Sequence, residues 1–341
     1  MTAIAASRGL WLRGRTFDLG FILGSASVAL LAGFTVVLQP GLFAPVLLLD
    51  LWLLGYHHVI ATFTQIAFDV TSVRQHRFLV LGLPPFVILG TFVLAVLIGL
   101  WAIVTLYLYW QWFHYTRQSY GISQAYARKS GTPLEDAPLT KVALYLLPLW
   151  GILHRSAERP PTFLGQEVKV LPVPELLANA VGVCAIAVCL YWALGRIRAW
   201  HAGRLPAAHT LYLLSHFAVF FVGYVAIADI NFGWLTINIW HNAQYILFVW
   251  LANNRRFEGK VHPEHRLLSR MSQRRNVVLY FGVCLAVTVT VYLTIQSLLT
   301  ALTLGSLAYM LLIYQSLNFH HYIVDAIIWR GSQKKARENP A

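Results

Sequence analysis

Long apolar stretches follow one another along this 341-residue chain, and they constrain its fold more than any other feature. A transmembrane helix needs about 20 apolar residues, because it crosses a hydrocarbon core with every backbone group hydrogen-bonded internally. Only 11% of the residues are charged, whereas a soluble domain carries about 25%. The sequence therefore predicts an all-α, polytopic integral membrane helical bundle of about ten transmembrane helices, at residues 17–38, 41–69, 78–98, 99–127, 139–154, 176–198, 207–228, 230–252, 276–298 and 302–329.

Lysine and arginine side chains gather in alternate loops between these stretches. By the positive-inside rule, this pattern places both termini in the cytoplasm. The sequence then divides into a basic cytoplasmic N-terminal segment (1–16), a single transmembrane domain (17–329) and a basic cytoplasmic tail (330–341). The net charge of +13 is explained by topology and by anionic lipid, and a nucleic-acid partner is not expected. A bacterial-type inner membrane is the predicted location.

Histidines lie inside four of the predicted spans, as the pairs His57–His58 and His320–His321 and the single residues His114 and His241. Each motif precedes a basic loop by a similar number of residues; both His114 and His241 lie 14 residues before an arginine. At about 1.5 Å per residue, 14 residues correspond to about 21 Å of helix. The motifs are therefore expected at one depth of the bilayer. Ionisable side chains at that depth are costly and usually serve a function.

Other polar side chains share helix faces with these histidines. Steps of three and four residues connect His58 to Thr62, Gln65 and Asp69, His241 to Asn238 and Gln244, and His321 to Asn318 and Asp325. Imidazole is the commonest metal ligand, so the sequence predicts a buried metal site. The predicted ligands or orienting groups are His57, His58, His114, His241, His320, His321, Asp69, Asp325 and Gln244. Tyr115 and Tyr245 are the predicted catalytic side chains, which would shape a hydrophobic substrate slot.

The function predicted from this pattern is a membrane oxidoreductase. Imidazoles with carboxylates suit iron, so the expected cofactor is non-haem iron, with one or two ions. The substrate would be hydrophobic and lipid-like, and the reaction would be hydroxylation, desaturation or oxidative cleavage. The basic loop at residues 253–275 would either contact lipid headgroups or dock a soluble electron donor.

The abundance of histidine resembles that of membrane fatty acid desaturases and hydroxylases, but their HxxxH and HxxHH boxes are absent from this sequence. The dispersed histidines are also similar to those of bacterial carotene oxygenases, without a motif that matches residue by residue. The sequence therefore assigns the chain to neither family.

Three other functions stay open. A haem-binding or quinone-linked electron-transfer subunit would use axial histidines, for example His114 with His241 on haem b. A metal-ion or proton-coupled transporter would use histidine and aspartate as relays. In a purely structural subunit the histidines would only form hydrogen bonds between helices.

Overall fold

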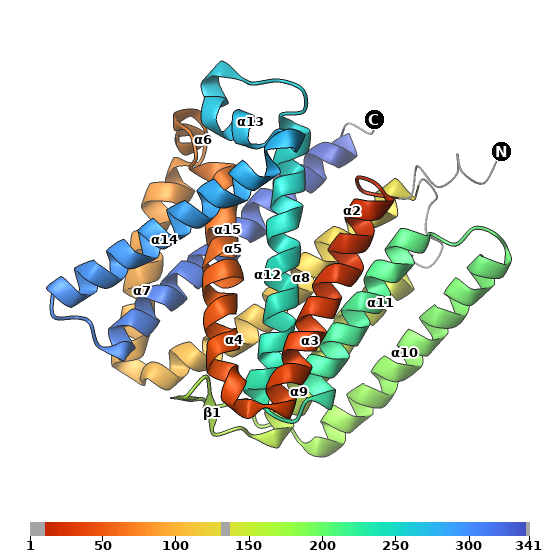
Figure 1. Cartoon of the computed structure of the whole chain (residues 1–341). Helices are drawn as coiled ribbons and strands as arrows, with labels where there is room; N and C mark the ends of the chain where they lie inside the picture. The colour runs from red at the N-terminus through yellow and green to blue at the C-terminus, as the bar shows by residue number, and fades with distance from the viewer. Residues whose placement is uncertain (1–10, 131–136, 339–341) are drawn as a thin grey trace. The chain divides into compact units, whose positions relative to one another are not determined.

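The structure, a computed structural model, describes residues 11–130 and 137–338. It is 85% helical, and its one short hairpin pairs β1 (Thr162–Phe163) with β2 (Gln166–Glu167) in antiparallel register (Figure 1). The prediction of an all-helical fold is confirmed. Parts of the predicted terminal segments, residues 1–10 and 339–341, lie outside the described residues.

Regular α-helices account for most of the described chain. They are α2 (Arg15–Leu19), α3 (Ser25–Leu38), α4 (Phe43–Asp50), α5 (Tyr56–Ile66), α6 (Val70–Gln75), α7 (Leu83–Ile98), α8 (Leu100–Lys129), α9 (Ala137–Glu158), α10 (Glu175–His201), α11 (Ala207–Phe221), α12 (Ile230–Arg256), α13 (Arg266–Met271), α14 (Val277–Ala301) and α15 (Leu307–Glu338).

Short π-helical and 3-10 segments join several of these helices. The π-helical segments are η1 (Gly20–Gly24), η3 (Leu51–Gly55), η4 (Phe78–Gly82) and η5 (Val222–Ala226), and the 3-10 segments are η2 (Pro40–Leu42), η6 (Pro263–His265) and η7 (Arg274–Asn276). Because a π-turn pairs each carbonyl with an amide five residues on, it shifts the register of the side chains that follow.

Among the described residues, six helices are long and apolar enough to cross a membrane, which indicates a membrane protein. They are Arg15–Leu38, Pro40–Ile66, Phe78–Ile98, Glu175–His201, Ala207–Ala226 and Arg274–Ala301. The other four predicted spans correspond to the more polar helices α8, α9, α12 and α15. The total of about ten spans and the cytoplasmic termini therefore stay predictions.

The described chain forms two compact units. Of the described residues, unit 1 contains 11–46, 108–130 and 137–244, and unit 2 contains 47–107 and 245–338. In unit 1, α9 packs along α10 and against α11, and Ala143, Leu144, Trp192 and Leu213 form a buried cluster (Figure 1). In unit 2, α7 packs on α15 and α5 packs on α14.

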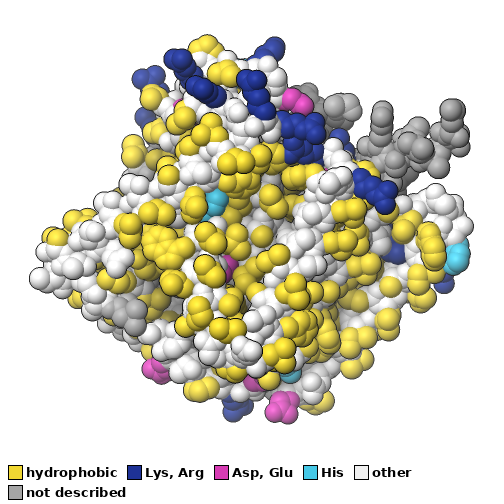
Figure 2. All heavy atoms as spheres, viewed as in Figure 1, with side chains coloured by type: hydrophobic (Ala, Val, Ile, Leu, Met, Phe, Trp, Pro, Cys, Tyr) yellow, Lys and Arg dark blue, Asp and Glu magenta, His cyan; other side chains and the backbone are white. Residues whose placement is uncertain are grey.

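Apolar side chains also cover much of the face shown in Figure 2, where they are yellow. Val96 on α7 and Leu176 on α10 are each 81% exposed. Large exposed apolar areas are rare on soluble monomers, whereas helices that face lipid require them. The surface therefore agrees with the membrane assignment from helix length and composition.

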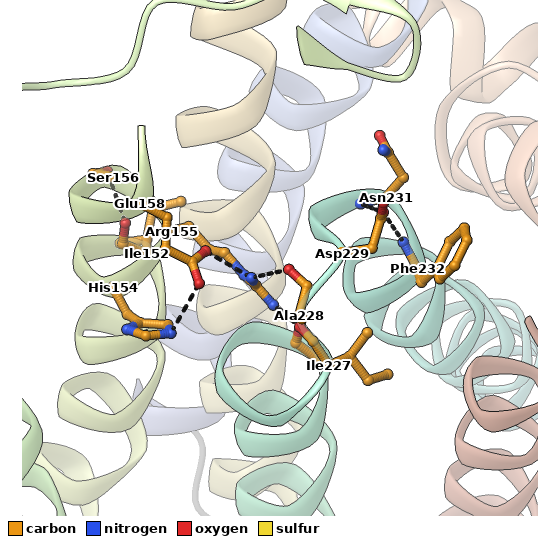
Figure 3. A network of polar contacts seen from close by, with 11 residues as sticks. Ile152, His154, Arg155, Ser156, Glu158, Ile227, Ala228, Asp229, Asn231 and Phe232 are labelled. Atoms are coloured by element: carbon orange, nitrogen blue, oxygen red, sulfur yellow. Dashed lines mark hydrogen bonds and ion pairs between the residues drawn. The ribbon is translucent and has the colours of Figure 1, made fainter. Parts of the chain in front are cut away.

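A buried arginine holds the end of one helix in unit 1 (Figure 3). Arg155, near the end of α9, is 1% exposed, and its guanidinium donates to the backbone oxygens of Gly223, Ile227 and Ala228. The last carbonyls of a helix lack partners within it, so Arg155 caps the end of η5. Its Nη1 also lies 2.7 Å from Glu158 Oε2. The cap fixes the turn before α12, which carries His241.

Two glycines let η5 and α12 approach closely within unit 1. A Cβ atom added to Gly233 would collide with the backbone oxygen of Gly223, and one added to Gly223 would lie 2.7 Å from the oxygen of Gly233. Backbone atoms cannot rotate away, so only glycine fits at this crossing. Small residues allow such close approaches between membrane helices.

We expect Gly233→Ala to lower the free energy of unfolding by about 1–3 kcal/mol or more, the usual cost of overpacking. Denaturation of the purified protein in mixed micelles measures this loss. The matched control is Gly195→Ala on α10, where an added Cβ meets no atom within 4 Å and alanine favours the helix. Equal stability of the Gly233 variant and the wild type would contradict the proposed close crossing.

Candidate metal centre

His58 lies at the start of α5 in unit 2, with 4% of its surface exposed. Its Nδ1 lies 3.2 Å from the backbone oxygen of Gly55, the last residue of η3. A carbonyl oxygen can only accept a hydrogen bond, so Nδ1 carries the proton in this contact. In the neutral ring the lone pair then belongs to Nε2, the nitrogen that could bind a metal.

A continuous run of hydrogen bonds connects His321 on α15 to Asp325 on the same helix. Thr62 Oγ1 on α5 lies 2.7 Å from His321 Nδ1 and 2.8 Å from Tyr245 Oη on α12. The Tyr245 hydroxyl then donates to Asp325 Oδ1. All four side chains are buried, and His321 and Tyr245 are at most 1% exposed.

The direction of these bonds follows from which groups can donate. Tyr245 gives its proton to the Asp325 carboxylate, so its oxygen accepts from Thr62, and Thr62 in turn accepts from Nδ1–H of His321. Each hydroxyl then donates once and accepts once. This arrangement leaves the lone pair of His321 on Nε2. Metal-binding histidines characteristically donate their other ring N–H to a carboxylate or another acceptor, which fixes the tautomer.

The two imidazoles in unit 2 lie against each other. The ring centroids of His58 and His321 are 4.3 Å apart with the planes nearly perpendicular, and the Tyr245 ring lies 4.9 Å from that of His58. Asp325 Oδ1 is 3.8 Å from His321 Nδ1. Unit 2 therefore combines two buried imidazoles with one carboxylate, and buried histidines of this chain could hold a metal ion.

The first histidine of each pair, His57 or His320, points elsewhere. His57 Nδ1 contacts the oxygen of Leu53 at 3.3 Å, and its ring meets Phe281 edge to face. His320 donates from Nε2 to the oxygen of Leu79 at 2.7 Å, and its ring stacks on Phe63. Adjacent residues of an α-helix point about 100° apart. The structure therefore brings one predicted histidine of each pair, His58 and His321, into the group.

His114 on α8 and His241 on α12 form a second buried pair in unit 1. Their ring centroids are 5.1 Å apart, and the Tyr115 ring lies 4.0 Å from that of His241. The Tyr115 hydroxyl donates to Asn238 Oδ1. Gln118 donates to the backbone oxygen of His241 at 3.2 Å. Glutamine, asparagine and tyrosine side chains thus hold the backbone and rings around this pair.

The two predicted catalytic tyrosines use their hydroxyls to position other groups. The hydroxyl of Tyr115 is bonded to Asn238 in unit 1, and that of Tyr245 to Thr62 and Asp325 in unit 2. The structure also gives a role to Thr62, which lies one helical turn after His58: its hydroxyl connects His321 to Tyr245.

Gln244, a predicted ligand or orienting group, holds neighbouring helices together in unit 1. Its Oε1 lies 3.5 Å from the Tyr212 hydroxyl, and its Nε2 lies 3.4 Å from Ser25 Oγ. These contacts connect α12 to α11 and α3. The oxygen and the nitrogen of the Gln244 amide therefore both form hydrogen bonds to neighbouring helices.

Asp69, another predicted ligand or orienting group, lies apart from the His58 group for a structural reason. The prediction extended one helix face from His58 to Asp69, but α5 ends at Ile66 and the backbone leaves the helical conformation at Ala67. Asp69 instead caps α6, where it accepts from the Ser72 amide at 2.8 Å. Its carboxylate also pairs with His265, with 2.8 Å between Oδ2 and Nδ1.

The environment of Asp69 predicts an acid-sensitive contribution to stability. Burial raises the pKa of Asp69, but the hydrogen bonds from Ser72 and His265 and the charge of His265 outweigh burial and lower it. A carboxyl with a lowered folded pKa stabilises the fold above its unfolded pKa of about 3.9. This contribution is lost as the pH falls through the folded pKa.

Melting temperatures of the wild type and Asp69→Asn between pH 7 and pH 3 test this expectation. We expect the wild type to be the more stable near neutral pH, and the difference to shrink below about pH 4. A difference that is constant over the whole range would show that the charge of Asp69 contributes nothing.

Comparisons with protein-family models, with curated proteins and with solved structures find no match to this chain.

Proposed function

We propose that this protein is a membrane-embedded, histidine-ligated metalloenzyme, and that its metal is non-haem iron, with one or two ions. The observation that carries the proposal is the directed hydrogen-bond run from His321 through Thr62 and Tyr245 to Asp325. A histidine that only joins two helices needs a single partner. Hydrogen bonds that connect a carboxylate to one ring nitrogen are typical of a histidine whose other ring nitrogen binds a metal.

The donor set supports iron among the transition metals. Imidazole is a ligand that suits iron, and a carboxylate that orients such an imidazole, as Asp325 orients His321, makes it a stronger ligand. We infer that His58 and His321 bind through Nε2 and that Asp325 orients His321, and that His114 and His241 form a second pair of ligands. Iron held by these groups would supply the redox chemistry of hydroxylation, desaturation or oxidative cleavage.

The proposed substrate and partners follow from the setting of the site. Many large apolar side chains are exposed on the described part of the chain, so a lipid-like substrate could reach the protein from within a bilayer. The proposed electron donor is a soluble protein that docks on the basic loop at residues 253–275, in the cytoplasm below a bacterial-type inner membrane. Tyr115 and Tyr245 would hold the histidines in place during turnover.

Metal analysis of the detergent-purified protein, together with its optical spectrum, tests the proposal. Near-stoichiometric iron without a Soret band is the expected result. A Soret band would instead favour the electron-transfer function with axial histidines. A colourless protein that takes up no iron on reconstitution would overturn the metalloenzyme proposal.

A further inference from the structure

A basic cavity lies in unit 2, in the loop between α12 and α14. It has a volume of about 470 Å³ and is lined by Gly259, Lys260, Val261, Gln273, Arg274 and Arg275. Its lining holds three cationic side chains and no acidic one, and all three cations are exposed. Lys and Arg side chains gather at the top of Figure 2, in the region where Figure 1 labels α13.

Hydrogen bonds hold the walls of this cavity in place. Gln273 Nε2 is within hydrogen-bond distance of the backbone oxygens of Phe257, Lys260 and Ser269, at 2.8, 3.0 and 2.7 Å. One side chain thereby ties together three separate points of the loop. Gly259 has a φ of 73°, a backbone conformation that glycine adopts without steric cost. The loop therefore keeps Lys260 close to Arg274 and Arg275 although their charges repel one another.

The position of the cavity indicates what neutralises these charges. Arg274 is the first residue of the apolar span Arg274–Ala301, which is long and apolar enough to cross a membrane. We therefore place the cavity at the level where this helix would leave the hydrocarbon. Phospholipid phosphates occupy that level, and anionic lipid attracts basic residues there. The guanidinium group of arginine is particularly suited to phosphate, because two of its N–H groups can donate charge-assisted hydrogen bonds to two phosphate oxygens at once.

We propose that this cavity is a binding site for the phosphate group of an anionic phospholipid. Lys260, Arg274 and Arg275 bind the phosphate oxygens, and the acyl chains extend along the apolar surface of α14. On this surface Val278 is 82% exposed and Leu279 is 45% exposed. None of the proposed metal ligands lines this cavity, so lipid binding does not depend on the metal. The cavity does form part of the loop at residues 253–275 on which the proposed electron donor docks.

The test compares two double variants of the full-length protein with equal loss of charge. Arg274→Gln with Arg275→Gln removes cations from the cavity, and Arg266→Gln with Arg270→Gln removes exposed cations of α13 that do not line it. Binding of phosphatidylglycerol to each purified protein is measured in detergent by titration, with phosphatidylcholine as the neutral lipid. Metal content is measured in the same samples, so that failure of either proposal is seen separately.

We expect the cavity variant to bind phosphatidylglycerol at least tenfold more weakly than the wild type, and the α13 variant to bind nearly as well as the wild type. If both variants lose affinity for phosphatidylglycerol equally, binding depends on the overall surface charge and the proposal is wrong. The proposal is also wrong if the wild type binds phosphatidylcholine as tightly as phosphatidylglycerol. Binding of inorganic phosphate as tight as that of phosphatidylglycerol would show a site for a free anion rather than for a lipid.

Discussion

Replacing His321 with alanine is expected to abolish iron binding while the protein still inserts and folds. The imidazole of His321 is fully buried and is oriented through Thr62 and Tyr245 by Asp325. Alanine removes the proposed ligand atom Nε2 altogether. His58→Ala should have the same effect, because His58 is the other proposed ligand in unit 2. Iron per chain, measured after purification from cells grown with added iron, gives the result.

The adjacent histidine provides a matched control for this experiment. His320 is as buried as His321, but it donates to the backbone oxygen of Leu79 and packs on Phe63. His320→Ala should therefore retain iron, at some cost in stability. Equal iron loss from both variants would contradict the assignment of His321 as the ligand.

The residues that orient His321 should show a graded effect. Thr62→Val removes the hydroxyl between His321 and Tyr245, and Asp325→Asn removes the charge at the end of the run. Mutation of such orienting partners typically weakens metal affinity about 10–100-fold, less than the loss of a ligand. Iron affinity is measured by competition with a chelator. Unchanged affinity in both variants would mean that the hydrogen-bond run has no part in metal binding.

Replacing Arg155 with alanine is expected to destabilise unit 1 by about 3 kcal/mol or more. Three backbone oxygens, those of Gly223, Ile227 and Ala228, lose their donor together. A buried polar group that is left without a partner costs about 1–3 kcal/mol. Arg155→Lys should recover only part of the loss, because an ammonium group lacks the planar fork of arginine. Free energies of unfolding of the purified variants measure the effect.

Glu158 separates the helix-capping role of Arg155 from its ion pair. Glu158 is 39% exposed, and ion pairs at the surface contribute at most about 1 kcal/mol. Glu158→Gln should therefore cost much less than Arg155→Ala. Similar losses in the two variants would show that the ion pair, and not the cap on η5, is what Arg155 provides.

The sequence alone predicted the helical class and the position of most helices. Periodic apolar stretches of sufficient length leave few alternatives in a bilayer, because unpaired backbone groups are excluded from hydrocarbon. Apolar periodicity does not define where each helix ends. The predicted span 41–69 extended beyond the end of α5 at Ile66, because the polar residues after it still matched a helical period. The same period places Asp69 on the helix face of His58. In the structure the helical conformation ends at Ala67, and Asp69 caps the next helix, α6.

The sequence also singled out the buried histidines, since imidazole inside an apolar helix is unusual enough to stand out. It did not decide which histidine of each pair, His57 or His58 and His320 or His321, would join a group. That choice depends on how α5 and α15 are rotated about their axes, and the rotation is set by packing against other helices. Neighbouring residues differ by about 100° around a helix, so a small rotation exchanges their roles.

What the sequence by itself determined is therefore the chemistry that lies buried in this protein: apolar helices with histidines, tyrosines and carboxylates inside them. What only the tertiary structure decided is which of these groups contact one another. The run from His321 to Asp325 passes through Thr62 and Tyr245 on two other helices, and no local sequence pattern encodes that path. The physical reason is that helix periodicity is a local property, whereas hydrogen bonds between helices depend on the packing of residues far apart in the chain.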